Sequence, residues 1–381
     1  MISDWQELTW GDLATLEYGK GLRDYKSNQG SYRVYGTNGA IGWHTEALCK
    51  HAGIIIGRKG AYRGVHYSDK PFYVIDTAFY LKPKSNAEID LKWAYYELLT
   101  KDINSMDSGS AIPSTTRESF YQLPVKKPPI EEQRRIAEML SSLDEKIELN
   151  LQMNVTLEKI VQAIFKKWFV DFQFPDFDGE LVDGLPKGWR TARLGEVVEV
   201  KGGTTPSTKE AKFWDGENFW ATPKDLSNLQ FPVLLNTERK ITNEGVKQIG
   251  SGILPKGTLL LSSRAPIGYL AIAQIPVSIN QGFIAIQGLS VSNLFMLYWL
   301  KMNMDMVKSR ANGSTFQEIS KGSFREIEIA IPEQKILKLF DETNEPIFER
   351  IVSSEIENQT LTQIRDGLLP KLMSGKIRVA E

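Results

Sequence analysis

Apolar residues recur at alternating spacings of four and three from Glu131 to about Phe169. This is the a/d pattern of a helix that packs along another helix as a coiled coil. At 1.5 Å per residue, a helix of about forty residues would span roughly 60 Å, so the stretch is expected to be a spacer as well as a core element. The seam positions are Ile136, Leu140, Leu143, Ile147, Asn150, Asn154, Leu157, Val161, Ile164 and Trp168.

The C-terminal stretch repeats this rhythm, with Arg365 in one seam position and Pro346 expected to kink the helix or start it afresh. Asn154 and Asn358 both occupy a-type positions, where asparagine costs stability but can fix register if two of them face each other. We therefore predict that the two helices pair antiparallel within one chain. The residues expected to carry the pairing are Ile147, Asn154, Leu157, Val161, Ile351, Asn358, Leu361 and Leu368.

Each helix follows a block of short apolar runs separated by Gly-rich turns, which is typical of strands. In the first block we expect strands at 53–57, 72–81 and about 123–126, and a helix at about 91–105. A Ser/Gly-rich loop at 108–117 precedes the final strand. The block is therefore expected to mix strands and helices.

The second block repeats the first. Gly11 and Gly19 correspond to Gly195 and Gly203 at an offset of 184, and Gly109-Ser110 corresponds to Gly313-Ser314 at an offset of 204. We interpret the chain as a duplicated globule-plus-helix unit and predict an α+β fold: two α/β domains in a pseudo-twofold arrangement, separated by an antiparallel two-helix coiled coil. The predicted parts are a first globule at 1–129, a central helix at 130–171, a linker at 172–188, a second globule at 189–332 and a C-terminal helix at 333–381.

Charge is distributed unevenly along the chain. The net charge of −1 combines +2 and +4 for the two globules with −2, −3 and −2 for the central helix, linker and C-terminal helix. Two basic surfaces on an acidic frame would suit a polyanion, although ordinary surface charge explains these counts equally well. The single Cys49 excludes an internal disulfide framework, and the lack of a signal-type segment or long apolar run predicts a cytoplasmic protein.

The sequence carries no motif for catalysis. Lys127-Pro128-Pro129-Ile130 lacks the amide and the aromatic residue of an adenine methyltransferase motif, and no phosphate-binding loop is present. Asp24-Tyr25-Lys26 and Pro175-Asp176 could belong to a nuclease, but a loop salt pair and a linker acid explain them better. His44, His51 and His66 lie near Cys49 without the close ligand pairs that zinc sites use, so we predict no metal site.

Taken together, the whole chain resembles the S (specificity) subunit of type I restriction-modification systems. The motifs that carry the resemblance are Trp189-x-x-x-x-Leu194-Gly195-Glu196, Gly202-Gly203-Thr204-Thr205-Pro206-Ser207, Ala221-Thr222-Pro223-Lys224-Asp225-Leu226, Leu260-Leu261-Ser262-Ser263-Arg264, Asn280-Gln281-Gly282-Phe283 and Pro129-Ile130-Glu131-Glu132-Gln133. In that family each globule is a target recognition domain that reads one half of a split, asymmetric DNA site, and the helices set the spacing and dock two methyltransferase subunits.

The resemblance implies double-stranded DNA as a partner and a recognition subunit with no catalysis of its own. S-adenosylmethionine would be bound by the methyltransferase subunits and not by this chain. Whether restriction subunits also join the complex is left open. Two other readings are a self-sufficient or nicking DNA enzyme, which the missing motifs disfavour, and a stand-alone DNA-binding regulator, which would more often use two identical chains on a palindromic target.

Polar and basic residues in the Gly-rich loops are candidates for DNA contact, because Lys, Ser and Thr bind phosphates and Arg, Asn and Gln can pair with base edges. In the first globule these are Lys20, Arg23, Lys26, Arg58, Lys59, Arg63, Ser110 and Arg117. In the second they are Lys201, Thr204, Thr205, Ser207, Lys224, Arg264, Asn312, Ser314 and Thr315. Asn280-Gln281 lies at a strand edge, where bonding to the backbone explains it equally well.

Overall fold

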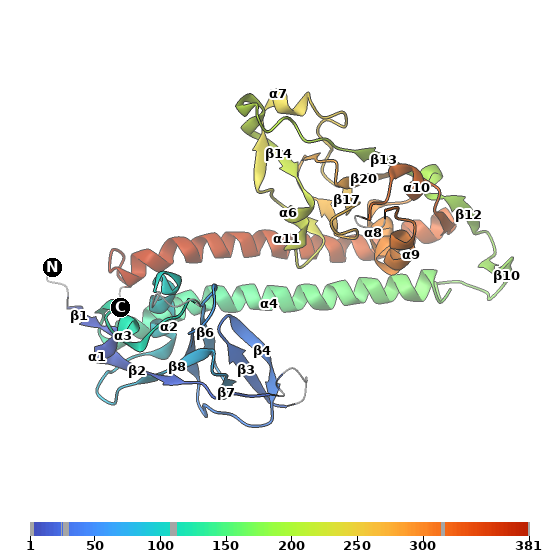
Figure 1. The fold of residues 1–381 in the computed structure, drawn as a ribbon. Helices are drawn as coiled ribbons and strands as arrows, with labels where there is room; N and C mark the ends of the chain where they lie inside the picture. Colours follow the sequence, from blue (N-terminus) through green and yellow to red (C-terminus); the bar gives the residue numbers. More distant parts are fainter. Residues whose placement is uncertain (1–3, 24, 26–29, 107–112, 314–316, 380–381) are drawn as a thin grey trace. The chain divides into compact units, whose positions relative to one another are not determined.

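The fold consists of two compact units that each combine one globule with segments of two long helices (Figure 1). Unit 1 comprises Met1–Glu148 with Thr360–Glu381, and unit 2 comprises Leu149–Gln359. A computed structural model of the chain describes residues 4–23, 25, 30–106, 113–313 and 317–379. Unit 1 therefore combines two segments that are far apart in sequence, whereas unit 2 is one continuous segment.

The globule of unit 1 contains a four-stranded sheet of order β2-β8-β5-β6, a three-stranded sheet of order β4-β3-β7 and the pair β1-β9. Its elements are β1 (Gln6–Thr9), α1 (Trp10–Leu13), β2 (Ala14–Tyr18), β3 (Tyr32–Gly36), β4 (Gly39–His44), β5 (Gly53–Gly57), β6 (Val65–Ser68), β7 (Phe72–Val74), β8 (Ala78–Pro83), α2 (Leu91–Leu99), the 3₁₀ turn Ile103–Ser105, α3 (Arg117–Tyr121) and β9 (Pro124–Lys127).

The globule of unit 2 contains a five-stranded sheet of order β13-β20-β17-β18-β15, a three-stranded sheet of order β16-β14-β19 and the pairs β12-β21 and β10-β11. Its elements are β10 (Leu181–Val182), β11 (Leu185–Pro186), β12 (Arg190–Arg193), α5 (Leu194–Val197), β13 (Val198–Gly202), the 3₁₀ turn Ala211–Phe213, β14 (Trp214–Ala221), α6 (Pro223–Ser227), β15 (Val233–Leu234), β16 (Arg239–Ile241), α7 (Asn243–Val246), β17 (Leu259–Ser262), β18 (Leu270–Ala273), β19 (Ser278–Ile279), β20 (Phe283–Gly288), α8 (Asn293–Met302), α9 (Met304–Ser309), α10 (Lys321–Arg325) and β21 (Glu328–Ile331).

The two globules share one topology. The order β2-β8-β5-β6 is matched by β13-β20-β17-β18, and the pair β1-β9 by β12-β21. The three-stranded sheets also agree, since each joins an antiparallel pair (β3-β4, β14-β16) to a parallel one (β3-β7, β14-β19). The predicted duplication is confirmed at the level of strand order, although the side chains differ.

The two long helices, α4 (Ile130–Phe169) and α11 (Gln334–Met373), each contain 40 residues. In unit 2, the amide of Asn150 donates to the side-chain oxygen of Asn358 at 2.9 Å, and the amide of Asn154 donates to Glu355 at 2.8 Å. Residue numbers rise along α4 as they fall along α11, so the segments are antiparallel (Figure 1). The predicted antiparallel pairing is confirmed, but the partner of Asn358 is Asn150 and not Asn154.

In unit 1 the arginine in the seam has a specific partner. Arg365 donates to Asp144 at 2.7 Å, and the other oxygen of Asp144 accepts from the hydroxyl of Tyr96 on α2 at 2.6 Å. A charged residue is tolerated at this apolar position because a carboxylate satisfies it. The link also fixes α2 against the long helices.

Burial along the predicted seam is uneven. Val161, Ile351 and Asn154 are fully buried, and Asn358 is nearly so. The other four predicted pairing residues, Ile147, Leu157, Leu361 and Leu368, are half-buried. The seam is therefore tightest in unit 2, where α8 also packs against it.

Of the two outcomes expected at Pro346, a kink or a fresh start of the helix, the fresh start is wrong. Helix α11 continues from Gln334 to Met373 as one element. Proline removes one backbone hydrogen bond, at a cost of about 3 kcal/mol in a helix interior. Phe340 and Phe348, on either side of Pro346, are buried in the core of unit 2, and burying two such side chains offsets a cost of that size.

Two elements differ in extent from the sequence prediction. The strand expected at 72–81 is divided into β7 and β8, because the chain turns between them and Ala78 donates its N–H to the carbonyl of Ile75 at 3.1 Å. The helix expected at about 91–105 ends at Leu99, since the hydroxyl of Thr100 bonds the carbonyl of Glu97 at 2.6 Å. Local hydrogen bonds at these turns override the apolar periodicity.

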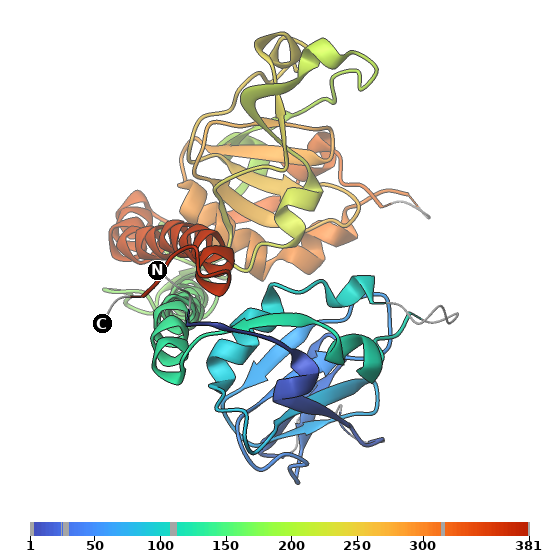
Figure 2. The same cartoon turned by 90° about the vertical axis from the view of Figure 1, so that its left-hand side faces the viewer.

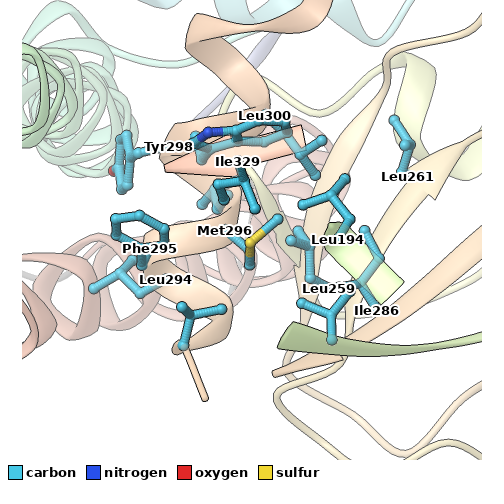
Figure 3. Packing of buried hydrophobic residues seen from close by; sticks show 14 of the residues in the cluster. Leu194, Leu259, Leu261, Ile286, Leu294, Phe295, Met296, Tyr298, Leu300 and Ile329 are labelled. Carbon is cyan, nitrogen blue, oxygen red and sulfur yellow. The ribbon is translucent and has the colours of Figure 1, made fainter. Parts of the chain in front are cut away.

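Helix α8 lies between the sheet of unit 2 and the long helices (Figures 2 and 3). Its Phe295 ring lies 5.4 Å from that of Phe165 on α4. Its Tyr298 donates to Glu158 on α4 at 2.9 Å, and Lys301 forms an ion pair with the same carboxylate. This helix carries apolar residues on every side because both of its faces are covered.

Replacing Asn358 with alanine should lower the free energy of unfolding by about 1–3 kcal/mol, because the amide of Asn150 loses a buried acceptor. Urea unfolding compared with the unsubstituted chain measures the effect. Gln359→Ala, an exposed position on the same helix, is the matched control and should change stability little. Equal losses in both variants would contradict the prediction.

A second prediction concerns Asp341 on α11, which accepts from the hydroxyl of Ser292 at the start of α8 at 2.6 Å. Burial raises the pKa of Asp341 to about 6, so its folded-state pKa lies above its unfolded value. The carboxyl therefore contributes most to the free energy of unfolding below about pH 4. About 2–3 kcal/mol of this free energy is lost as the pH rises to about 6. We expect Asp341→Asn to match the unsubstituted chain near pH 4 and to exceed its stability at pH 7, as measured by urea unfolding.

Glu342→Gln, at an exposed neighbouring position, provides the control, and its effect should hardly depend on pH. A stability difference for Asp341→Asn that stays constant from pH 4 to pH 7 would show that folding does not raise the pKa of this carboxyl, and would contradict the prediction.

Candidate nucleic-acid interface

In unit 1, several of the predicted contact residues meet where β2 and β5 end and β8 begins. The backbone N–H groups of Arg58 and Lys59 both donate to the carbonyl of Thr77, at 2.9 and 3.2 Å. Lys59 also forms a β-bridge with Ser114, in the segment that leads into α3. This edge therefore gathers Arg58, Lys59 and Arg117, and we call it edge 1.

An aromatic ring organises the arginines of edge 1. The guanidinium carbons of Arg58 and Arg117 lie 4.7 and 4.1 Å from the centroid of the Tyr18 ring, within the range of cation–π attraction. Tyr18 in turn packs on Phe79, with 5.0 Å between ring centroids. The sequence analysis missed Tyr18, although an aromatic residue directly before Gly19-Lys20 was a usable signal.

Close backbone approach explains one of the glycine pairs that revealed the duplication. A Cβ on Gly19 would lie 2.1 Å from the carbonyl oxygen of Ile75, and one on Gly203 would lie 1.8 Å from that of Ile279. No side chain fits at either position. The strand that ends in this glycine is thus held against the same neighbouring segment in both units.

The remaining candidates of the first globule divide into three groups. Lys20 and Arg23 are exposed just beyond β2. Arg63 is only 3% exposed, and its guanidinium donates to the carbonyls of Asn104 and Met106 at 2.6 and 3.0 Å. Its donors stabilise a loop and are not available to DNA. Lys26 and Ser110 lie outside the described residues.

Unit 2 has the corresponding edge, which we call edge 2, where β13 and β17 end and β20 begins. Arg264 forms a β-bridge with Glu318 in the segment before α10, as Lys59 does with Ser114 in unit 1. Thr204 donates its N–H to Ile279 at 3.1 Å, and the hydroxyl of Thr205 bonds the side-chain oxygen of Gln281 at 2.6 Å. Edge 2 therefore gathers Thr204, Thr205 and Arg264.

Three of the candidate cations of unit 2 form ion pairs within the protein. Lys201 pairs with Glu199 at 3.4 Å, Lys224 with Glu238 at 2.8 Å, and Arg264 with Glu318 at 3.5 Å. Bonding to Glu238 raises the pKa of Lys224. In unit 1, by contrast, neither Arg58 nor Arg117 has a carboxylate partner among the described residues. The two edges thus share a backbone framework but differ in charge.

The other candidates of the second globule are dispersed. Ser207 is exposed, and its carbonyl accepts from the indole of Trp214 at 3.0 Å. Asn312 is exposed and exchanges backbone hydrogen bonds with Glu318. The side chain of Asn280 accepts from the N–H of Gly282 at 2.8 Å, so it bonds to the backbone. Ser314 and Thr315 lie outside the described residues.

A second feature that the sequence analysis missed is found on the three-stranded sheets. Arg33 lies 4.7 Å from the ring centroid of Trp43 across β3 and β4. On the corresponding strands of unit 2, Arg239 lies 3.6 Å from Trp214 and Lys240 lies 4.7 Å from Phe219. The signal was the placement of aromatic and basic residues on adjacent strands, which becomes visible only once the strands are paired.

Within the described residues, no group of three or more His, Cys, Asp and Glu side chains could hold a metal ion. Burial raises the pKa of Cys49 to about 12, which keeps the thiol protonated and makes it a poor ligand. The ring of His44 instead packs edge-on against Tyr73, with 5.2 Å between centroids. Among the helices of the described residues, none is long and apolar enough to cross a lipid bilayer.

The fold agrees with comparisons to known proteins. The family model described as "Type I restriction modification DNA specificity domain" matches residues 2–159 and 186–365. The type I restriction enzyme HindI specificity subunit of Haemophilus influenzae is 28% identical over 382 residues, covering 81% of this chain and 82% of that one. The MjaIX specificity subunit of Methanocaldococcus jannaschii is 39% identical over 186 residues, which is 46% of this chain and 42% of that relative.

A solved structure supports the fold. The crystal structure of the type I restriction-modification S subunit from M. genitalium superposes with a TM-score of 0.68 at 20% identity, covering 98% of this chain and 96% of that one. The resemblance inferred from the sequence motifs is thereby confirmed. Because the family's domain matches both halves of the sequence, the chain belongs to the family of type I restriction-modification DNA specificity subunits.

Proposed function

We propose that this chain is the non-catalytic subunit that selects the DNA target of a type I restriction-modification complex, reading a bipartite, asymmetric site. The observation that carries the proposal is the pair of corresponding edges: one backbone framework, used twice, presents different side chains. Edge 1 offers arginines on a tyrosine ring, and edge 2 offers threonines, a glutamine and an arginine paired with a carboxylate. Two readers of different chemistry in one chain suit two different half-sites.

The proposed DNA contacts are those predicted from the sequence that remain accessible. We keep Lys20, Arg23, Arg58, Lys59, Arg117, Lys201, Thr204, Thr205, Ser207, Lys224, Arg264 and Asn312, together with Lys26, Ser110, Ser314 and Thr315, which lie outside the described residues. Arg63 is withdrawn because its guanidinium is buried and bonded to carbonyl groups. Lys and exposed Ser or Thr would contact phosphates, and Arg, Asn and Gln would contact base edges.

The proposed parts keep the boundaries expected from the sequence: recognition domains at 1–129 and 189–332, helices at 130–171 and 333–381, and a linker at 172–188. In support of these boundaries, each helix follows its own globule in the sequence, and the two helices pair antiparallel.

The proposed partners are double-stranded DNA and two methyltransferase subunits, which would bind S-adenosylmethionine and perform the chemistry. The family supports this assignment, and restriction subunits would be added where the complex cleaves DNA. A cytoplasmic location belongs to the same proposal, because the DNA on which such a complex acts lies there. The chain itself would bind the DNA target and position the methyltransferase subunits on it.

Exchanging residues 1–129 for the corresponding domain of another specificity subunit should change one half of the methylated sequence and leave the other half unaltered. The reason is that the residues of each edge come from one unit alone. Mapping methylated adenines in a genome that carries the exchanged gene and its methyltransferase measures the outcome. A change in both halves, or in neither, would contradict independent reading.

The purified chain, mixed with S-adenosylmethionine and target DNA, should transfer no methyl group until the methyltransferase subunit is added. Transfer of labelled methyl groups to a duplex carrying the site, compared with a duplex of scrambled sequence, tests this. Methyl transfer by the chain alone would show that it is an enzyme. Sequence-specific binding that persists unchanged without any effect on methylation would instead favour a stand-alone regulator.

A further inference from the structure

Edge 1 holds two arginines that form no ion pair with a carboxylate of the described residues. Arg58 and Arg117 come from segments almost sixty residues apart and lie over the same Tyr18 ring, at 4.7 and 4.1 Å from its centroid. Neither forms an ion pair with any described residue, whereas three of the candidate cations of unit 2 do. Bringing two like charges together without a counter-ion costs free energy, and a bound acceptor would recover it.

Each guanidinium has donors to spare. Arg58 donates one N–H to the carbonyl of Asp76, at 2.9 Å. The Nε of Arg117 is buried and has no hydrogen-bond partner within the described part of the chain. Both side chains are half-buried, which restricts their rotation. Contact with a ring face limits how far each guanidinium can reorient, and its remaining N–H groups are left for an acceptor.

Such an arrangement suits a flat acceptor with two oxygen or nitrogen atoms in one plane. Guanine offers O6 and N7 side by side in the major groove, and bidentate pairing with arginine is the commonest specific contact in protein–DNA complexes. A phosphate needs only a positive charge, which the exposed Lys20 and Lys59 could supply without a fixed plane. The ring therefore adds what a base contact requires, namely orientation.

We propose that Arg58 and Arg117, oriented by Tyr18, read a guanine in the half-site assigned to the first recognition domain. This inference rests on the proposed function, since it names the base chemistry of one of the two readers. Arg58 and Arg117 would touch the base, and Tyr18 would act as a positioning residue. Edge 2 has no such pair, so the second half-site would not depend on this device.

The test uses the full chain assembled with its methyltransferase subunits and a library of duplexes in which every base pair of both half-sites is varied. Arg58→Lys and Arg117→Lys keep the charge but lose the planar fork, so discrimination at one guanine of the first half-site should fall by about 10- to 100-fold. Preference at the second half-site should stay intact, which also shows that the variant is folded. Arg134→Lys, which alters an exposed arginine paired with Glu131 on α4, is the matched control and should change nothing.

Tyr18→Leu provides an independent variant, because the arginines remain while their orientation is lost. It should weaken discrimination at the same guanine and leave the salt dependence of binding unaltered. Weaker binding of the lysine variants to all sequences alike, with discrimination at every guanine intact, would identify a phosphate contact and overturn the proposal. Unchanged discrimination in all three variants would also overturn it. If instead the unsubstituted complex shows no sequence preference at all, the proposed function itself fails.

Discussion

The structure depends on the requirement that each globule close its core with both long helices. In unit 1, the core that contains Trp10 and Trp93 also includes Ile136 and Leu140 from α4 and Leu372 from the end of α11. Residues near opposite ends of the chain must therefore come together before the first globule is complete. The globule and its helical segments are one folding unit, even though Leu372 lies more than two hundred residues after the globule in the sequence.

Polar contacts strengthen this closure. Glu132, in the first turn of α4, is almost fully buried and accepts from the indole of Trp5 at 2.9 Å. The same carboxylate binds Arg378, which lies beyond the end of α11. A buried carboxylate with two such donors is satisfied, whereas removal of Arg378 would leave its charge without compensation. The first turn of the helix thus ties the two ends of the chain together.

One backbone framework carries different side chains in the two units. The approach of Gly19 to Ile75 and of Gly203 to Ile279 fixes the same strand arrangement in both units. The side chains placed on that framework differ in charge and in hydrogen-bonding groups, and base recognition depends on those properties. Duplication followed by divergence at the edges preserves stability because the buried positions that close each core are separate from the edges.

The sequence alone determined the duplication, the presence of two long helices and their antiparallel pairing, because the a/d rhythm and the repeated glycines are properties of the order of residues. It also predicted which loops carry basic and amide groups. Tertiary structure decided which of these groups meet: Arg58, Arg117 and Tyr18 converge, whereas Arg63 turns inward to bond carbonyl groups. It likewise selected Asn150 as the partner of Asn358 and carried α11 through Pro346. Sequence periodicity records which face a residue occupies, but the neighbours across that face are set by packing between distant segments.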